Sequence, residues 1–164
     1  MGWIEDKRWS DRFLPEIKRI LGEHLIGEPP HEEDAERNTD LIVLRMEAVR
    51  IGCRVRTNYY AKHYPNEFTI REGRPSGAKT ELTKIVEGWG DYFLYGFSDE
   101  QQIALCNWFL GDMRVFRLWF NQSIVASKGR LPGIQKKNGD DSSWFRVFSI
   151  ADLPAEFVVA RKLS

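Results

Sequence analysis

The sequence predicts a single α+β domain spanning 1–164, with a mixed central sheet that carries helices on its faces. Three observations predict this class. The length of 164 residues suits one domain with its own hydrophobic core. Runs of β-branched and aromatic residues, typical of strands, cluster early, with helix-period segments before and after them. An aromatic content of 13% supplies the apolar surface that such a core requires.

The first half of the chain predicts one helix followed by three strands. Ser10 is a favourable N-cap, and apolar side chains recur at helical spacing from Phe13 to Leu25. The Pro29-Pro30 pair ends this helix, and an acidic segment that forms a loop or a short helix follows. Strands are expected at 41–46, 48–55 and 67–71.

The strand at 48–55 has the clearest alternation in the chain. Apolar residues at 49, 51, 53 and 55 alternate with Arg50, Arg54 and Arg56. Because successive side chains on a strand point to opposite faces, the pattern predicts one apolar face and one arginine face.

The second half predicts a helix, two strands, another helix and late strands. Thr80 is expected to cap a helix that ends at Gly88 and Gly90, and Asp112 is expected to cap a later helix. The segment 127–143 is rich in Gly, Lys and Asp, which predicts an exposed loop. Strands are expected at 92–97, 103–110, 144–150 and 157–160.

Composition argues against several classes of protein. No apolar stretch approaches the ~18 residues of a membrane span, and the charged N-terminus lacks a signal-peptide core, so we expect a cytoplasmic protein without a membrane partner. The 24 basic and 24 acidic residues balance, so any nucleic-acid binding must come from a local patch. Cys53 and Cys106 lack CxxC or Cys/His spacing, so we expect buried thiols rather than a disulfide framework or a zinc site.

The acidic segment before the first strand could hold a divalent cation. Glu32, Glu33 and Asp34 lie about six residues before Asp40. Carboxylate oxygens of this kind suit Mg²⁺ or Mn²⁺. The alternative is a solvated acidic loop.

Basic and aromatic residues are interleaved from Arg50 to Lys84. This stretch holds eight bases and three acids, a net charge of +5. Basic side chains suit phosphates and flat rings suit unstacked bases, so the stretch predicts nucleic-acid binding. The alternative is that the arginines only keep an exposed strand face soluble. The predicted contact residues are Arg50, Arg54, Arg56, Tyr59, Tyr60, Arg71 and Arg74.

The order helix, three strands, helix, strand, with Asp40 opening a strand, resembles the PD-(D/E)xK nuclease superfamily over roughly 10–97. The resemblance implies an αβββαβ-like nuclease core, followed here by a C-terminal helix and strands, in which Glu33 and Asp40 ligate Mg²⁺ or Mn²⁺. The acidic-x-Lys tripeptide of the family would fall at Arg54-Val55-Arg56, where an arginine, which cannot ligate a metal, replaces the carboxylate. A substitute carboxylate would come from Glu33, Glu47 or Glu67. The catalytic residues implied are Glu33, Asp40, Arg56 and Lys84.

Three functions follow from these patterns. The first is a metal-dependent phosphodiester hydrolase, a nuclease. The second is a non-catalytic module that binds nucleic acid or a host protein, and it is of phage type because 80–97, with Gly88-Trp89-Gly90-Asp91-Tyr92, resembles phage and prophage proteins. The third is a protein–protein interaction domain with Trp3, Trp9 or Trp144 as anchors.

Overall fold

The computed structural model describes residues 3–27, 42–43, 49–140 and 142–163, and the chain divides into two compact units, Met1–Ala48 and Val49–Ser164. The first unit contains two helices and an antiparallel pair of short strands. Among the described residues, no helix is both long enough and apolar enough to cross a bilayer. The elements of the first unit are α1 (Trp3–Asp11), α2 (Leu14–Leu25), β1 (Ile26–Gly27) and β2 (Ile42–Val43).

The start of the predicted N-terminal helix differs from the prediction. Ser10 lies inside α1, where its hydroxyl donates to the carbonyl of Lys7 (3.0 Å), so the prediction that Ser10 caps the amphipathic helix is wrong. The amphipathic helix is α2, and it begins where the Phe13 carbonyl accepts from the N–H of Ile17 (2.9 Å). The charged sequence of α1 lacks a continuous apolar stripe, and its periodicity therefore gave no sign of a separate helix. As the periodicity of α2 predicts, Phe13, Ile17 and Ile20 are buried.

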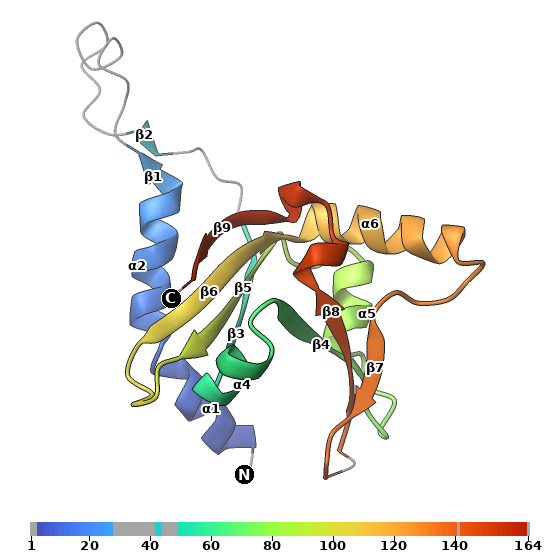
Figure 1. The fold of residues 1–164 in the computed structure, drawn as a ribbon, viewed down its shortest axis with the longest axis horizontal. Helices are drawn as coiled ribbons and strands as arrows, with labels where there is room; N and C mark the ends of the chain where they lie inside the picture. Colours follow the sequence, from blue (N-terminus) through green and yellow to red (C-terminus); the bar gives the residue numbers. More distant parts are fainter. Residues whose placement is uncertain (1–2, 28–41, 44–48, 141, 164) are drawn as a thin grey trace, which may run out of the picture. The chain divides into compact units, whose positions relative to one another are not determined.

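The second unit contains a four-stranded mixed sheet in the order β3-β5-β6-β9 (Figure 1). β3 (Ile51–Arg56) runs parallel to β5 (Tyr92–Ser98), and the other pairs are antiparallel. Parallel neighbours require a crossover, which here contains two short helices and a strand of another sheet. The predicted α+β class, a mixed sheet with helices, is confirmed. The remaining elements named here are β6 (Leu105–Asp112), β9 (Val158–Lys162), α4 (Asn58–His63) and α5 (Glu81–Val86).

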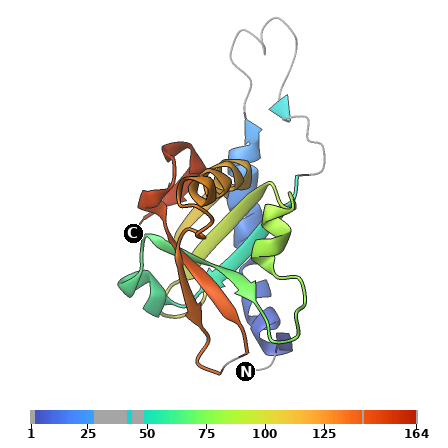
Figure 2. The ribbon, with the colours of Figure 1, turned by 90° about the vertical axis from the view of Figure 1, so that its right-hand side faces the viewer.

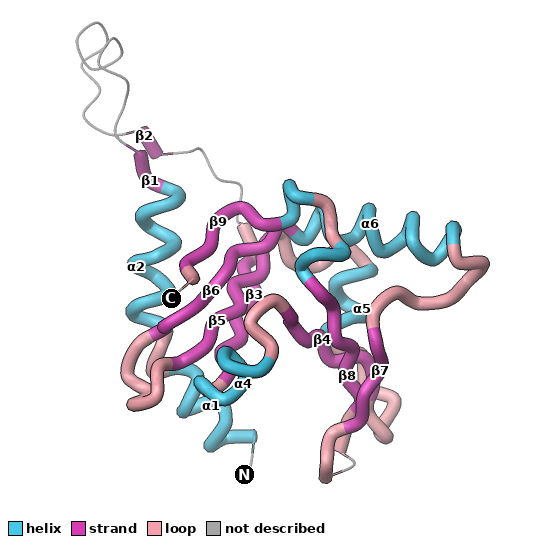
Figure 3. The backbone as a smooth tube through the Cα atoms, viewed as in Figure 1, coloured by secondary structure: helices cyan, strands magenta, loops and turns pink. Residues whose placement is uncertain are grey.

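A second, antiparallel sheet in this unit has the order β4-β8-β7. The strands predicted for one central sheet are therefore divided between two sheets (Figure 3), because β4 (Glu67–Gly73) pairs with β8 (Trp144–Ser149) and not with β3. β7 (Ile134–Lys137) lies in the segment predicted to be a loop, and all four of its residues are exposed, so no buried face marked it as a strand. α6 (Met113–Ala126) precedes β7, and two 3₁₀ turns, Ile150–Asp152 and Ala155–Phe157, join β8 to β9.

Aromatic rings from both sheets and from α6 form the core of the second unit. Phe68 of β4 is fully buried and stacks on Phe148 of β8 and on Phe157, with ring centroids 5.4 and 5.5 Å apart. Phe116 of α6 meets Phe148 edge to face at 5.1 Å. Phe109 of the mixed sheet packs on Phe68 at 5.5 Å, so this cluster joins the two sheets to α6. Figure 2 shows α6 nearly end-on beside the strands of the mixed sheet.

The arginine face of β3 points toward the second sheet. Register places Arg54 opposite Tyr95 and Arg56 opposite Phe97, and cross-strand partners share a face. Both arginines are half-buried, so at these two positions the face is not simply a solvated surface, whereas Arg50, before the strand, is exposed. On the other face only Val55 is buried, while Cys53 is exposed and Cys106 on β6 is half-buried, which also corrects the prediction of buried thiols.

Besides Ser10, two helix caps were predicted, and they behave differently. Asp112 caps α6 as predicted, because its carboxylate accepts from the N–H of Arg114 (2.8 Å). Thr80 occupies the N-cap position of α5, but its hydroxyl donates to the carbonyl of Glu72 (2.7 Å) instead of accepting from the helix. Thr80 therefore joins the start of α5 to the end of β4.

A buried ion pair joins the ends of β4 and β8. The guanidinium of Arg146 donates to Glu72 through Nε (3.1 Å) and Nη2 (2.8 Å). Its Nη1 donates to the carbonyls of Leu131, Pro132 and Gly133, which lead into β7. Arg146 thus fixes one end of the antiparallel sheet and the loop that precedes its edge strand.

Candidate functional site

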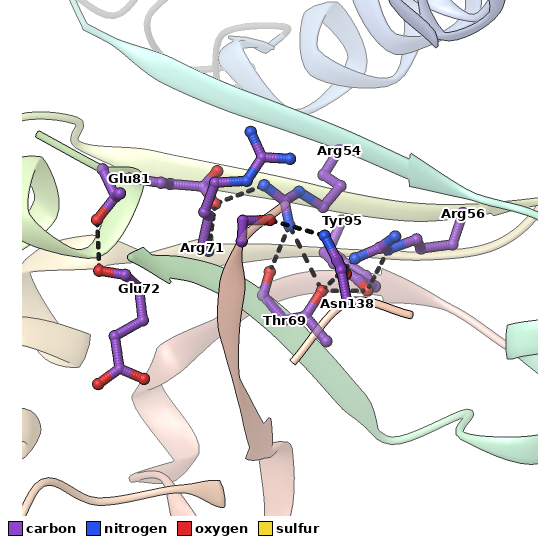
Figure 4. Close-up of polar contacts among 10 residues, drawn as sticks. Arg54, Arg56, Thr69, Arg71, Glu72, Glu81, Tyr95 and Asn138 are labelled. Carbon is purple, nitrogen blue, oxygen red and sulfur yellow. Dashed lines mark hydrogen bonds and ion pairs between the residues drawn. The ribbon is translucent and has the colours of Figure 1, made fainter. Parts of the chain in front are cut away.

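Four side chains form a polar seam between the two sheets of the second unit, namely Arg54, Arg56, Thr69 and Tyr95. Arg54 Nη1 donates to the backbone carbonyl of Thr69 (3.1 Å), and Arg56 Nη2 donates to the Thr69 hydroxyl (2.6 Å). Arg56 Nε contacts the Tyr95 hydroxyl at 3.3 Å. Figure 4 shows both arginines pointing at Thr69 of β4, with Tyr95 beside them. The seam holds two positive charges in fixed positions.

Glu81 neutralises and orients one of these two arginines. Its carboxylate accepts from Arg54 Nη2 (2.6 Å) and from the backbone N–H of Arg71 (3.0 Å). Burial lowers the pKa of Arg54, the nearby Glu81 carboxylate opposes that effect, and an arginine in this setting keeps its charge. Glu81 at the start of α5 therefore couples this helix to both β3 and β4.

A hollow of about 410 Å³ opens beside the seam, and we call it the basic pocket. Its cations come from β3, from β4 and the loop after it, and from α5. Glu81 is its only acidic lining residue among the described residues. The aromatic side chains of Trp89 and Tyr92 also line it. The cationic lining residues are Arg54, Arg71, Arg74, Lys79 and Lys84.

Most of the positive charge of the basic pocket is not neutralised locally. Arg54 is paired with Glu81, and Lys79 is paired with Glu87 at 2.7 Å. No described carboxylate lies within ion-pair distance of the other three lining cations, which are Arg71, Arg74 and Lys84. Unpaired cations around one hollow attract anions, and phosphate oxygens in particular.

Trp89 presents an exposed ring at the rim of the basic pocket. It is 56% exposed, and the guanidinium of Arg50 lies 5.4 Å from its ring centroid. The loop that carries it follows α5, and its flanking glycines, Gly88 and Gly90, have positive φ values of 102° and 83°. Arg117 of α6 donates to the Gly90 carbonyl (2.8 Å), which fixes the loop. An exposed indole beside cations offers a stacking surface.

A second, smaller hollow of about 190 Å³ lies on the other side of the seam, and we call it the aromatic pocket. Thr69 and Tyr95 of the seam form part of its wall. Two cations lie over its rings, with Arg56 5.4 Å from the Tyr60 centroid and the Lys136 ammonium 5.8 Å from that of Tyr64. The other lining residues are Tyr60 and Tyr64 from α4 and its C-cap, Glu67 from β4, and Phe97, Lys136, Phe145 and Val147 from β5, β7 and β8.

The structure brings some of the predicted site residues together and separates others. The basic pocket is lined by Arg54, Arg71, Arg74 and Lys84. Arg50 is near its rim, because its guanidinium lies over the ring of Trp89. Arg56 and Tyr60 belong to the aromatic pocket. Tyr59 lies apart from both pockets, in a hollow with Lys62 and Glu100, and stacks on His63 at 4.2 Å.

The predicted metal ligands cannot be placed in the same way. Glu33 and Asp40 lie outside the described residues, as does Glu47, and Glu67 lines the aromatic pocket. Among the described residues, no group of three His, Cys, Asp or Glu side chains is arranged to hold a metal ion. Binding of Mg²⁺ or Mn²⁺ therefore stays a prediction that depends on the acidic segment.

Several residues of the two pockets were not predicted from the sequence. Trp89 could have been suspected, because an aromatic residue between two glycines marks an exposed turn. Thr69, Tyr95 and Phe145 carry no such local signal, because only strand pairing between distant segments brings them to the seam and the aromatic pocket. Glu81 carries no such signal either, because its contact with Arg54 depends on the same packing.

The chain was compared with protein-family models, with curated proteins and with solved structures, and none of them matches it.

Proposed function

We propose that the second unit binds nucleic acid, with phosphate groups held in the basic pocket. The observation that carries this proposal is the gathering of Arg71, Arg74 and Lys84 around one hollow without a described carboxylate partner. The net charge of the chain is zero, so this local excess of positive charge is not a consequence of composition. Local excesses of this kind are the electrostatic mark of a phosphate-binding surface.

The fixed position of the Arg54 side chain supports the same proposal. Its guanidinium is held by Glu81 and by the carbonyl of Thr69, so little side-chain freedom remains to be lost when an anion binds. Arg71, which lines the same pocket, is fixed at its backbone by Glu81. A pre-ordered arginine beside the other cations of the pocket can hold one phosphate in a defined position.

The aromatic surface favours a polynucleotide over a free inorganic anion. Trp89 is exposed at the pocket rim with Arg50 over its ring, so the cationic surface continues beyond the pocket. Base-stacking rings beside phosphate-binding cations are the usual combination in proteins that bind single strands. A site for phosphate alone would not use an exposed indole.

Cleavage of the bound strand is a separate proposal. A metal-dependent nuclease would use Glu33 and Asp40 as ligands, with Arg56 and Lys84 stabilising charge on the phosphate. Binding requires none of these carboxylates. A non-catalytic module of the phage type would show the same binding and no cleavage.

The experiment is equilibrium binding of a 20-nucleotide single strand, followed by fluorescence anisotropy at low salt. We expect Lys84→Glu to weaken binding on the order of tenfold, because it removes a phosphate contact and adds a repulsive charge. Arg130→Glu is the matched control, since Arg130 is exposed after α6 and lines neither pocket. Equal losses in the two variants would contradict a specific site.

Cleavage is tested on the same oligonucleotide with Mg²⁺ or Mn²⁺ added. If the nuclease proposal is correct, the strand is cut and Asp40→Ala abolishes cutting while binding persists. Cutting that survives in Asp40→Ala would reject the assignment of this residue. Binding without cutting in either metal would leave the non-catalytic module as the function.

A further inference from the structure

The aromatic pocket has the size and the lining of a site for one flat ring system. Its volume of about 190 Å³ is below the roughly 300–1,000 Å³ typical of pockets for drug-sized ligands. Rings from three different elements line it, namely Tyr64 at the end of α4, Tyr95 on β5 and Phe145 on β8. Aromatic walls of this kind bind a planar ligand by stacking.

The charges around the aromatic pocket select against a cationic ligand. Arg56 lies close to the Tyr60 ring and Lys136 to the Tyr64 ring, so two positive charges of the chain itself would repel a quaternary ammonium here. Glu67 is the acidic lining residue of this pocket, and its half-buried carboxylate can accept from an amino group. The lining therefore suits an uncharged planar ring with hydrogen-bonding edges, attached to an anion.

The aromatic pocket and the basic pocket lie along one face of β4. Glu67, Thr69 and Arg71 alternate on this strand, so they share a face and span about 13 Å. Glu67 and Thr69 line the aromatic pocket, and Arg71 lines the basic pocket. Arg71 is also the register partner of Phe145, which places a ring of one pocket directly beside a cation of the other.

We propose that the aromatic pocket takes a single unstacked base of a single-stranded nucleic acid whose phosphates lie in the basic pocket. This inference rests on the proposed function and names its substrate class. A base in a duplex is stacked on both faces, so only a single strand, or a base turned out of a helix, can enter a pocket walled by rings. The hydroxyl groups of Thr69 and Tyr95 form the polar part of the pocket wall, where Arg56 holds them in place, and Lys136 also lines the pocket.

The test compares two 20-nucleotide strands of equal charge, one with bases and one in which every sugar is abasic. We expect the full-length chain to bind the strand with bases at least about tenfold more tightly, because stacking on aromatic side chains contributes that much per base. Tyr64→Leu is expected to remove the part of this preference that the aromatic pocket supplies, while stacking on Trp89 persists, and Tyr64→Phe, which keeps the ring, is expected to retain the full preference. Neither substitution should change the salt dependence of binding.

The outcomes separate this inference from the proposed function. Equal affinity for the two strands, or an undiminished preference in Tyr64→Leu, would overturn the base pocket and leave phosphate binding intact. If neither strand binds to the wild-type chain, the proposed function fails and the base pocket fails with it. The unfolding midpoints of the two Tyr64 variants, measured by circular dichroism, serve to confirm that both are folded.

Discussion

Two arginine–glutamate pairs lie near the same end of β4, and they differ in how much of the guanidinium remains available. All three guanidinium nitrogens of Arg146 donate hydrogen bonds within the fold, two of them to Glu72 and the third to backbone carbonyls. Arg54 donates hydrogen bonds from one nitrogen to Glu81 and from another to Thr69, and its side chain lines the open basic pocket. Side-chain exposure follows the same order, 9% for Arg146 and 20% for Arg54. Burial alone therefore does not identify an arginine as part of a binding site. The distinguishing feature of Arg54 is that it also borders a hollow.

The largest loss of stability is expected when the Arg146–Glu72 pair is broken, because every guanidinium nitrogen of Arg146 is hydrogen-bonded within the fold. Arg146→Met removes the cation from a buried carboxylate and leaves the carbonyls of the loop before β7 without their donor. Breaking one side of a buried ion pair costs about 3–5 kcal/mol, so we expect the free energy of unfolding in urea to fall by that amount. The double variant Arg146→Met/Glu72→Leu should recover part of the loss. A loss below about 1 kcal/mol in the single variant would show that the pair is not structural.

The Arg54–Glu81 pair is expected to respond in two opposite directions. Glu81→Gln weakens hydrogen bonds to Arg54 and to the Arg71 N–H, and we expect the free energy of unfolding to fall by about 1–3 kcal/mol. The same change removes the acidic lining residue of the basic pocket, so binding of the single strand should become a few-fold tighter at low salt. Urea unfolding and fluorescence anisotropy measure the two effects.

Glu87→Gln is the matched control for that prediction. Glu87 pairs with Lys79, but both side chains are much more exposed, at 39% and 66%. We expect a stability change of less than about 1 kcal/mol, because exposed ion pairs contribute little. If Glu81→Gln stabilised the chain or weakened strand binding, Glu81 would not act as a counter-charge within the site.

The sequence predicted the basic residues of the site but not the contacts that hold them in position. Arg54, Arg71, Arg74 and Lys84 fall in one short stretch, so their charge was visible locally. The sequence did not show which guanidinium groups remain free to bind a ligand, because their partners are distant in the chain. Glu72 and Arg146, for example, are 74 residues apart. The same limit applies to the fold. Periodicity predicted most strands of the second unit, but not that β4 would leave β3 and pair with β8.

Apart from the Glu87→Gln control, the smallest effect is expected for a third carboxylate–arginine pair, the local one at the start of α6. Burial would raise the pKa of Asp112, but hydrogen bonds from the Arg114 side chain and backbone outweigh it and lower the pKa below its usual range. A carboxylate with a depressed pKa stabilises the fold above its unfolded pKa, and the contribution is lost as the pH falls through the folded value. Asp112→Asn should cost about 1 kcal/mol at neutral pH and remove part of the stability loss below about pH 4. Urea unfolding as a function of pH measures both; an unchanged acid dependence would contradict this account of Asp112.

The central claim is that unpaired cations of the basic pocket contact phosphates. The most direct measurement is the dependence of single-strand affinity on salt concentration for the wild type and for Arg71→Ala/Lys84→Ala. Each phosphate contact to a single strand contributes about 0.7 to the slope of log affinity against log salt, so we expect the slope of the double variant to be shallower by about 1.4. An unchanged slope in a folded double variant would show that these cations do not meet the strand and would contradict the claim.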